Sequence, residues 1–276
     1  MSSLTRRRAR LLRPAAAVAA VALAGTALAG CSSSSPTDAA ASSSASGSGQ
    51  ALSGTITVFA AASLQKTFTA LSATFEKEHP GTTVKFSFGG SDTLAAQITQ
   101  GAPADVFAAA SQKTMQTVVT AGDSTGTPTV FVKNTLEIAV APGNPKGIKT
   151  LADLTKSGLK VAECASTVPC GSAAVKALAA ANVKLTPVTY ETDVTSALTK
   201  VELGEVDAAL VYHSDIVGAD GKVDGVVFST ASTAVNSYPI DVLKGSTNST
   251  LAQAFVAFIL SDSSEQVLLK AGFQAP

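Results

Sequence analysis

Short β-type runs and helical patterns alternate along this chain from Thr55 onward, and this alternation limits the possible folds more than any other feature of the sequence. Residues 55–60 predict a first strand, and apolar residues then recur at helical spacing from Leu64 to Phe75. Similar pairs follow as far as a final helix predicted over residues 250–260. Strands that alternate with helices in this way are typical of α/β folds with largely parallel sheets.

Length and composition fit two lobes of such a fold. The chain has 276 residues, of which 46% are hydrophobic and 14% are charged, so it can bury a substantial core. The formal charge is +0, but five of the twenty Lys and Arg residues are arginines within the first thirteen positions. The rest of the chain therefore contains fifteen basic residues and twenty Asp and Glu residues, which gives it a net charge of about −5. An acidic body without a cluster of basic residues argues against a nucleic-acid partner.

The first 30 residues have the pattern of an export signal. Arginines come first, a weakly apolar stretch covers residues 15–23, and the segment ends in Leu28-Ala29-Gly30-Cys31, which resembles a bacterial lipobox. A transmembrane anchor is the alternative, but the stretch is shorter than the ~20 residues that a span needs. We therefore expect a signal peptide over residues 1–30 and a lipid on Cys31. Residues 31–53 predict a Ser- and Ala-rich flexible tether, which places the mature protein outside the cytoplasmic membrane and anchored to it.

Two cysteines remain once Cys31 is assigned to the lipid. Cys164 and Cys170 are six positions apart, and an oxidising compartment favours a disulfide between them. A metal site built from cysteines is the alternative, but two thiols without a nearby histidine fall short of four ligands. We expect a disulfide and no cation site.

Four joints between a predicted strand or loop and the following helix share one composition. Each ends in small or hydroxylic residues: Ala61-Ala62-Ser63, Gly89-Gly90-Ser91, Pro169-Cys170-Gly171-Ser172 and Thr192-Asp193-Val194. The start of a helix offers unpaired backbone N–H groups and the positive end of a dipole, so it can bind an anion. In open α/β sheets such joints lie where ligands gather. Together they favour a shared anion site, although Ser63 and Ser91 taken singly would be ordinary N-caps.

Motifs of catalysis do not occur in the sequence. There is no G-x-S-x-G elbow, complete P-loop or H-E-x-x-H. His79, at a predicted helix end, and His213, after a predicted strand, are expected at the surface. Tyr212 taken alone would be a core or interface aromatic, and the carboxylates of residues 220–225 do not have the spacing of a calcium loop. We expect a binding protein without a cofactor rather than an enzyme.

Two stretches at these joints resemble signatures of the molybdate-binding proteins of ABC transporters. They are Val58-Phe59-Ala60-Ala61-Ala62-Ser63-Leu64, and Phe86-Ser87-Phe88-Gly89-Gly90-Ser91 followed by Gly101-Ala102-Pro103-Ala104-Asp105-Val106-Phe107-Ala108. Shorter matches lie at residues 168–171, 193–194, 202–205, 211–212 and 238–240. The resemblance therefore covers almost all of the chain from Thr55 to Phe273.

The resemblance implies a two-lobed type II solute-binding fold. Each lobe would be a mixed, mainly parallel sheet flanked by helices, with two chain crossings and the ligand in the cleft between the lobes. Lobe 1 is expected over residues 54–133 and 237–276, and lobe 2 over residues 134–236.

The resemblance also implies the site residues. The family's oxyanion contacts fall on the hydroxyl and N–H groups of Ser63 and Ser91, on the backbone N–H groups of Cys170 and Val194, and on the hydroxyl of Tyr212. The family commonly has Ala where Cys170 stands, but a backbone amide is all that the contact needs.

The function implied is a receptor that captures molybdate, and tungstate because its size and charge are nearly equal, for an ABC permease and its ATPase. Molybdenum would be present only as bound molybdate, and a monomer is expected. The alternatives are a receptor for sulfate or phosphate, or an extracytoplasmic α/β hydrolase.

Overall fold

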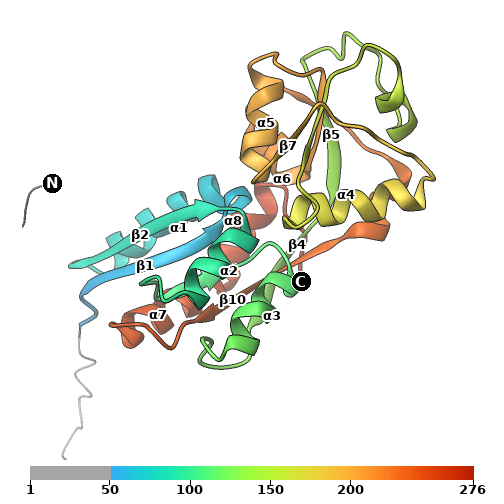
Figure 1. Cartoon of the computed structure of the whole chain (residues 1–276). Coiled ribbons are helices and arrows are strands. Elements are labelled where there is room, and N and C mark those ends of the chain that lie inside the picture. Colours follow the sequence, from blue (N-terminus) through green and yellow to red (C-terminus); the bar gives the residue numbers. More distant parts are fainter. Residues whose placement is uncertain (1–50) are drawn as a thin grey trace, which may run out of the picture. The chain divides into compact units, whose positions relative to one another are not determined.

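The computed structural model describes residues 51–276, so the expected signal peptide, the lipidation site Cys31 and most of the tether lie outside the described residues. The described chain forms two five-stranded sheets, each flanked by helices, and the chain crosses twice between them (Figure 1). We call the first sheet with its helices lobe 1 and the second sheet with its helices lobe 2.

The sheet of lobe 1 has the strand order β2-β1-β3-β10-β4. Its strands are β1 (Gly54–Ala61), β2 (Thr82–Gly89), β3 (Val106–Ala108), β4 (Thr129–Asn134) and β10 (Asn236–Val242). β1 pairs in parallel with β2 and β3, whereas β10 runs antiparallel to β3 and β4. The helices of this lobe are α1 (Gln65–Glu78), α2 (Ser91–Thr99), α3 (Gln112–Ala121), α7 (Ser249–Ile259) and α8 (Asp262–Lys270).

The sheet of lobe 2 repeats this plan with the strand order β7-β6-β8-β5-β9. Its strands are β5 (Leu136–Val140), β6 (Val161–Cys164), β7 (Thr189–Glu191), β8 (Ala208–Tyr212) and β9 (Asp224–Val226). β6 is parallel to β7 and β8, and β5 is antiparallel to β8 and β9. The helices are α4 (Pro169–Ala180), α5 (Val194–Glu202) and α6 (His213–Gly218), with short 3₁₀ turns η1 (Ala62–Leu64) in lobe 1 and η2 (Leu151–Thr155) and η3 (Ser229–Ala234) in lobe 2.

Both faces of the lobe 1 sheet are buried. On one side Val58 of β1 joins a cluster with Phe68 of α1 and Phe255 of α7, and on the other Phe59 joins a cluster with Leu94 of α2. Successive side chains of a strand point to opposite faces, so neighbouring apolar residues serve both clusters. This packing holds the carboxyl end of β1, and the joint that follows it, in a fixed place.

The chain crosses between the lobes from β4 to β5 and again from η3 to β10. Asn134, the last residue of β4, pairs with Asn236, the first residue of β10. Both asparagines are buried. The crossing strands therefore bring two polar side chains together between the lobes.

The two-lobed α/β fold expected from the sequence is confirmed. Some elements differ from the sequence pattern. Helical spacing predicts a helix over residues 173–181, but α4 begins at Pro169, because proline suits the first turn of a helix. The apolar residues 226–228 predict a strand, but β9 lies at Asp224–Val226. The sequence pattern predicts neither the short strand β7 nor the helices α6 and α8. Within residues 51–276, no helix is both long enough and apolar enough to cross a membrane.

Candidate anion-binding site

A small cavity lies between the lobes, at the four joints that the sequence singles out. Its volume is about 10 Å³, close to the ~10–15 Å³ that one water molecule needs and far below the ~300–1,000 Å³ usual for sites of organic ligands. The residues that line it are Ala61, Ala62, Ser63, Gly89, Gly90, Ser91 and Ala110 of lobe 1, and Val168, Pro169, Cys170, Asp193, Val194 and Tyr212 of lobe 2. All five predicted site residues are among them.

Helix starts surround the cavity, and two of them lack a side-chain cap. Neither α2, which begins at Ser91, nor α4, which begins at Pro169, has an N-cap side chain that accepts a hydrogen bond from its first turn. By contrast, Ser111, Asn248 and Ser261 cap α3, α7 and α8. The uncapped N–H groups of α2 and α4 need another acceptor, and the helix dipoles favour a negative one.

Two hydroxyl groups at the cavity each accept a hydrogen bond from the protein. Ser91, which is 1% exposed, accepts from the N–H of Ala110 at 3.0 Å. Tyr212, equally buried, accepts at 2.8 Å from the side-chain amide of Asn236. A hydroxyl that accepts in this way still has its own proton to donate, so both can donate to a ligand.

The third hydroxyl belongs to a chain of polar groups at the crossing strands. Ser63 Oγ lies 3.0 Å from the hydroxyl of Tyr238, which accepts a longer contact of 3.5 Å from the amide of Asn134. If Tyr238 accepts from Asn134 and donates to Ser63, the proton of Ser63 also remains for a ligand.

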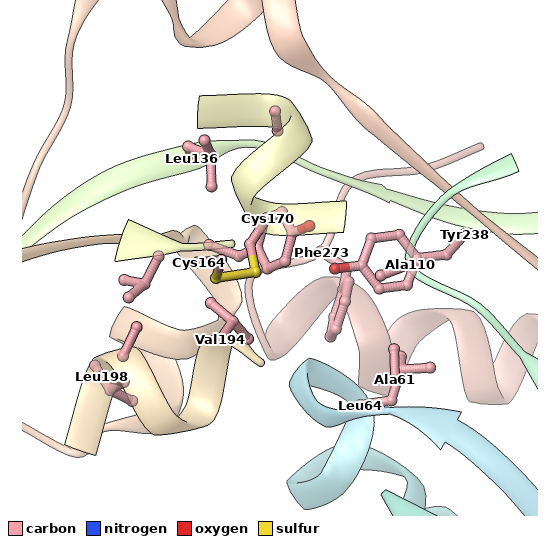
Figure 2. Packing of buried hydrophobic residues seen from close by; sticks show 14 of the residues in the cluster. Ala61, Leu64, Ala110, Leu136, Cys164, Cys170, Val194, Leu198, Tyr238 and Phe273 are labelled. Carbon is pink, nitrogen blue, oxygen red and sulfur yellow. A yellow bond between two sulfur atoms is a disulfide. The ribbon is translucent and has the colours of Figure 1, made fainter. Parts of the chain in front are cut away.

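A disulfide shapes the lobe 2 side of the cavity. The sulfurs of Cys164, at the end of β6, and Cys170, in the first turn of α4, are bonded, and Val194 lies beside them (Figure 2). The loop comes close to the helix start as well: a Cβ on Gly171 would lie 2.1 Å from the carbonyl oxygen of Ala165. The first turn of α4 is therefore held against the end of β6 by a covalent bond and by close backbone packing.

Cationic side chains are absent from the lining of the cavity. All five arginines of the sequence precede residue 14, so none belongs to the described residues. The one charged lining residue, Asp193, caps α5: its Oδ1 accepts from the N–H of Ser196 and its Oδ2 from the hydroxyl of the same residue, both at 2.9 Å. The cavity thus offers neutral donors and helix dipoles to an anion, without a counter-charge.

Burial controls the protonation of the groups behind the cavity. It raises the pKa of the Tyr212 phenol well above its usual value, and the charges of Tyr238 and Asp215 add to this effect. The phenol therefore keeps its proton at physiological pH. Burial also raises the pKa of Asp215 to about 7, although its carboxylate accepts from the N–H of Tyr212 at 2.9 Å.

The structure corrects one interpretation and adds residues that the sequence did not reveal. Neither serine is an N-cap: Gly90 occupies the N-cap position of α2, and Ser63 lies inside η1. Asn134, Asn236 and Tyr238 support the cavity from the crossing strands, and nothing in their local sequence predicts this.

The histidines lie away from the cavity. His213 Nδ1 is 2.8 Å from Glu137 Oε1, and the ring of His79 packs against that of Phe75 at a centroid distance of 4.6 Å and a tilt of 55°. Among residues 51–276, no three His, Cys, Asp or Glu side chains lie close enough together to hold a metal ion.

Comparisons with known proteins agree with this architecture. The family model of bacterial extracellular solute-binding proteins matches residues 56–274. The molybdate-binding protein ModA of Mycobacterium tuberculosis H37Rv is 46% identical over 222 residues, which cover 80% of this chain and 85% of that protein.

Two solved structures share the fold at lower sequence identity. The periplasmic molybdate-binding protein of Azotobacter vinelandii superposes with a TM-score of 0.70 at 21% identity. The match covers 80% of this chain and 99% of that protein. The sulfate-binding protein SubI of M. tuberculosis has a TM-score of 0.70 at 20% identity, with 80% of this chain and 86% of that chain covered. From the match over residues 56–274 and the 46% identity to ModA, the chain belongs to the family of bacterial extracellular solute-binding proteins.

Proposed function

We propose that this protein captures molybdate outside the cytoplasmic membrane and delivers it to an ABC permease. The observation that supports this most strongly is the small cation-free cavity at which helix starts and hydroxyl donors converge from both lobes. The 46% identity to a protein named molybdate-binding adds the chemical identity of the ion. Tungstate, of nearly equal size and the same charge, is expected to bind in the same way.

In this proposal the site replaces the water that a dianion loses. Ser63 and Ser91 donate through their hydroxyl and backbone N–H groups, Cys170 and Val194 through backbone N–H groups, and Tyr212 through its phenol. Burial of an ion without such replacement would cost many kcal/mol. Helix dipoles that point at the ion stabilise it without a buried cation.

Because the proposed donors come from both lobes, we expect the lobes to close around the ion. Ser63 and Ser91 belong to lobe 1, and the other three residues belong to lobe 2. An ion held by both lobes stabilises the closed arrangement over an open one, and a permease can then distinguish loaded from empty protein. We propose that lobe 1 spans residues 54–133 and 237–276 and lobe 2 residues 134–236, which differs from the division by sheets only at Asn134 and Asn236, the paired residues of the two crossings. We also propose that a lipid on Cys31 keeps the monomeric receptor at the membrane.

The alternatives fit the cavity less well. At neutral pH phosphate carries a proton that needs an acceptor, whereas the hydroxyl and N–H groups that the proposal assigns to the site are donors. Sulfate would find the same donors as molybdate, so ion size must separate the two. A hydrolase would need a base near a nucleophile, but neither histidine lines the cavity.

Thermal unfolding of the mature protein with molybdate, tungstate, sulfate and phosphate tests the proposal. An ion at ~1,000 times its dissociation constant stabilises by about 4 kcal/mol. For a protein of this size, that should raise the unfolding midpoint by roughly 8–16 °C. We expect this rise with molybdate and tungstate and smaller rises with the other ions. An unchanged midpoint with molybdate would disprove the proposal.

A further inference from the structure

One buried side-chain amide contacts groups on both sides of the cavity. Asn236, at the start of β10, is 9% exposed, and its Nδ2 donates to the carbonyl of Ala110 and to the hydroxyl of Tyr212, both at 2.8 Å. A longer contact of 3.4 Å reaches the carbonyl of Pro169. Ala110 belongs to lobe 1, and the other two acceptors belong to lobe 2. One nitrogen atom therefore joins the lobes directly behind the cavity.

Each of these three acceptors is next to a proposed oxyanion donor. The N–H of Ala110 donates to Ser91 Oγ. Pro169 precedes Cys170 in the first turn of α4, and Tyr212 is itself a proposed donor. A shift of the Asn236 amide would therefore disturb three of the five proposed contacts with the ion.

The amide also determines the direction of the Tyr212 proton. A phenol has one O–H, and an oxygen that accepts from an N–H cannot direct its own proton back along the same line. The two hydrogens of the amide are used by Ala110 and Tyr212, so the phenol proton is left for another acceptor. The cavity that Tyr212 lines is where an oxyanion would provide one.

We propose that Asn236 is a positioning residue: it turns Tyr212 into a hydrogen-bond donor toward the bound oxyanion and ties lobe 1 to lobe 2 behind the ion. This inference rests on the proposed function, because it concerns the same site. Without the amide, the carbonyls of Ala110 and Pro169 lose a donor. They then compete with the anion for the phenol proton.

Calorimetric titration with molybdate can separate this role from a general effect on the fold. The proteins are the mature wild type, Asn236→Ala, Tyr212→Phe and the double variant. We expect each single substitution to weaken binding about tenfold, as for the loss of one hydrogen bond to a charged ligand. Since Asn236 acts in part through Tyr212, the double variant should lose clearly less than the about hundredfold sum of the two single losses. Fully additive losses would overturn the proposal.

A second variant keeps the shape of the side chain. Asn236→Asp presents a carboxylate that accepts the phenol proton and repels the anion, so it should bind molybdate more weakly than Asn236→Ala. Equal or tighter binding by Asn236→Asp would contradict the proposed polarity. If Asn236→Ala does not fold, Asn236→Asp still tests the proposal, because its side chain has nearly the native volume.

The matched control is Asn248→Ala. Asn248 caps α7, with its Oδ1 accepting from the N–H of Leu251 at 3.3 Å, and it does not line the cavity. Its loss should lower the unfolding midpoint and leave the affinity for molybdate unchanged. A similar loss of affinity in Asn248→Ala would show that the effect at Asn236 is general destabilisation. Absence of molybdate binding by the wild type would overturn the proposed function itself, whereas wild-type binding with additive losses overturns only the role of Asn236.

Discussion

The substitution Gly90→Ala should act on closure of the lobes and leave the fold intact. Gly90 precedes α2 in lobe 1, and a Cβ placed on it would lie 2.4 Å from the carbonyl oxygen of Thr192 in lobe 2. Carbon and oxygen normally approach to about 3.3 Å, so the two lobes would have to separate by roughly 1 Å at this point. The other close atom, Asp92 Oδ1 at 2.8 Å, belongs to a side chain that can rotate away.

The expected size of the effect follows from this overlap. Overpacking of this kind typically costs about 1–3 kcal/mol, which corresponds to a roughly five- to 150-fold loss of affinity for molybdate. The backbone of Gly90 has φ −61° and ψ 129°, which alanine adopts without strain. The ligand-free protein in an open arrangement should therefore unfold at the same temperature as the wild type, or slightly higher because alanine restricts the unfolded chain.

The neighbouring glycine provides the control for this experiment. Gly89 also lines the cavity, but a Cβ on it would meet only the Leu94 side chain at an ordinary 3.9 Å. Calorimetry should find wild-type affinity in Gly89→Ala and the predicted loss in Gly90→Ala, and small-angle scattering should show a smaller compaction of Gly90→Ala on addition of molybdate. Equal affinities of the two variants would refute the reasoning, as would an equal loss of stability in the ligand-free Gly90→Ala protein.

Four further predictions concern other parts of the molecule. Ser91→Ala should weaken molybdate binding by roughly ten- to a hundredfold in calorimetry, because it removes a hydroxyl that donates to a charged ligand; unchanged affinity would place the ion elsewhere. Replacing Cys164 and Cys170 by serine should lower the free energy of unfolding by ~2 kcal/mol in denaturant titrations, the value expected for so short a loop. Burial raises the pKa of Asp215 to about 7 from 3.8. The folded state therefore binds a proton that the unfolded state has lost, and stability should fall as pH rises from about 4 to about 7; unfolding curves of Asp215→Asn should show a weaker fall. Cys31→Ala should abolish labelling by fatty acid and release the protein from the membrane or leave its precursor uncut, so normal labelling would contradict the lipobox assignment.

The convergence of the joints on one cavity could be predicted from the sequence because its signals are local. Small and hydroxylic residues before a helical pattern mark a helix start, and parallel strands bring such starts to one edge of a sheet. Ser63, Ser91, Cys170 and Val194 all line the cavity for this reason. Their contacts with the ion remain a prediction.

The groups behind the cavity could not be predicted because their contacts depend on the arrangement of the strands. Asn236 meets Tyr212 from 24 positions away and Ala110 from 126 positions away. The N-cap interpretation of Ser91 was wrong for a related reason, since its hydroxyl accepts from an N–H 19 positions along the chain. Such pairs follow only once the order of β3, β8 and β10 in the two sheets is known.

A cavity without cations also affects how fast an anion can arrive. Association rates rise when opposite charge around a site steers the ligand inward, and added salt then slows the encounter. Here the chain beyond the arginine-rich leader carries about −5, and no lining residue is positive, so a dianion approaches against a weak repulsive field. Added salt screens that field. The association rate constant for molybdate should therefore increase with ionic strength, the reverse of the behaviour of an anion receptor built around arginine or lysine.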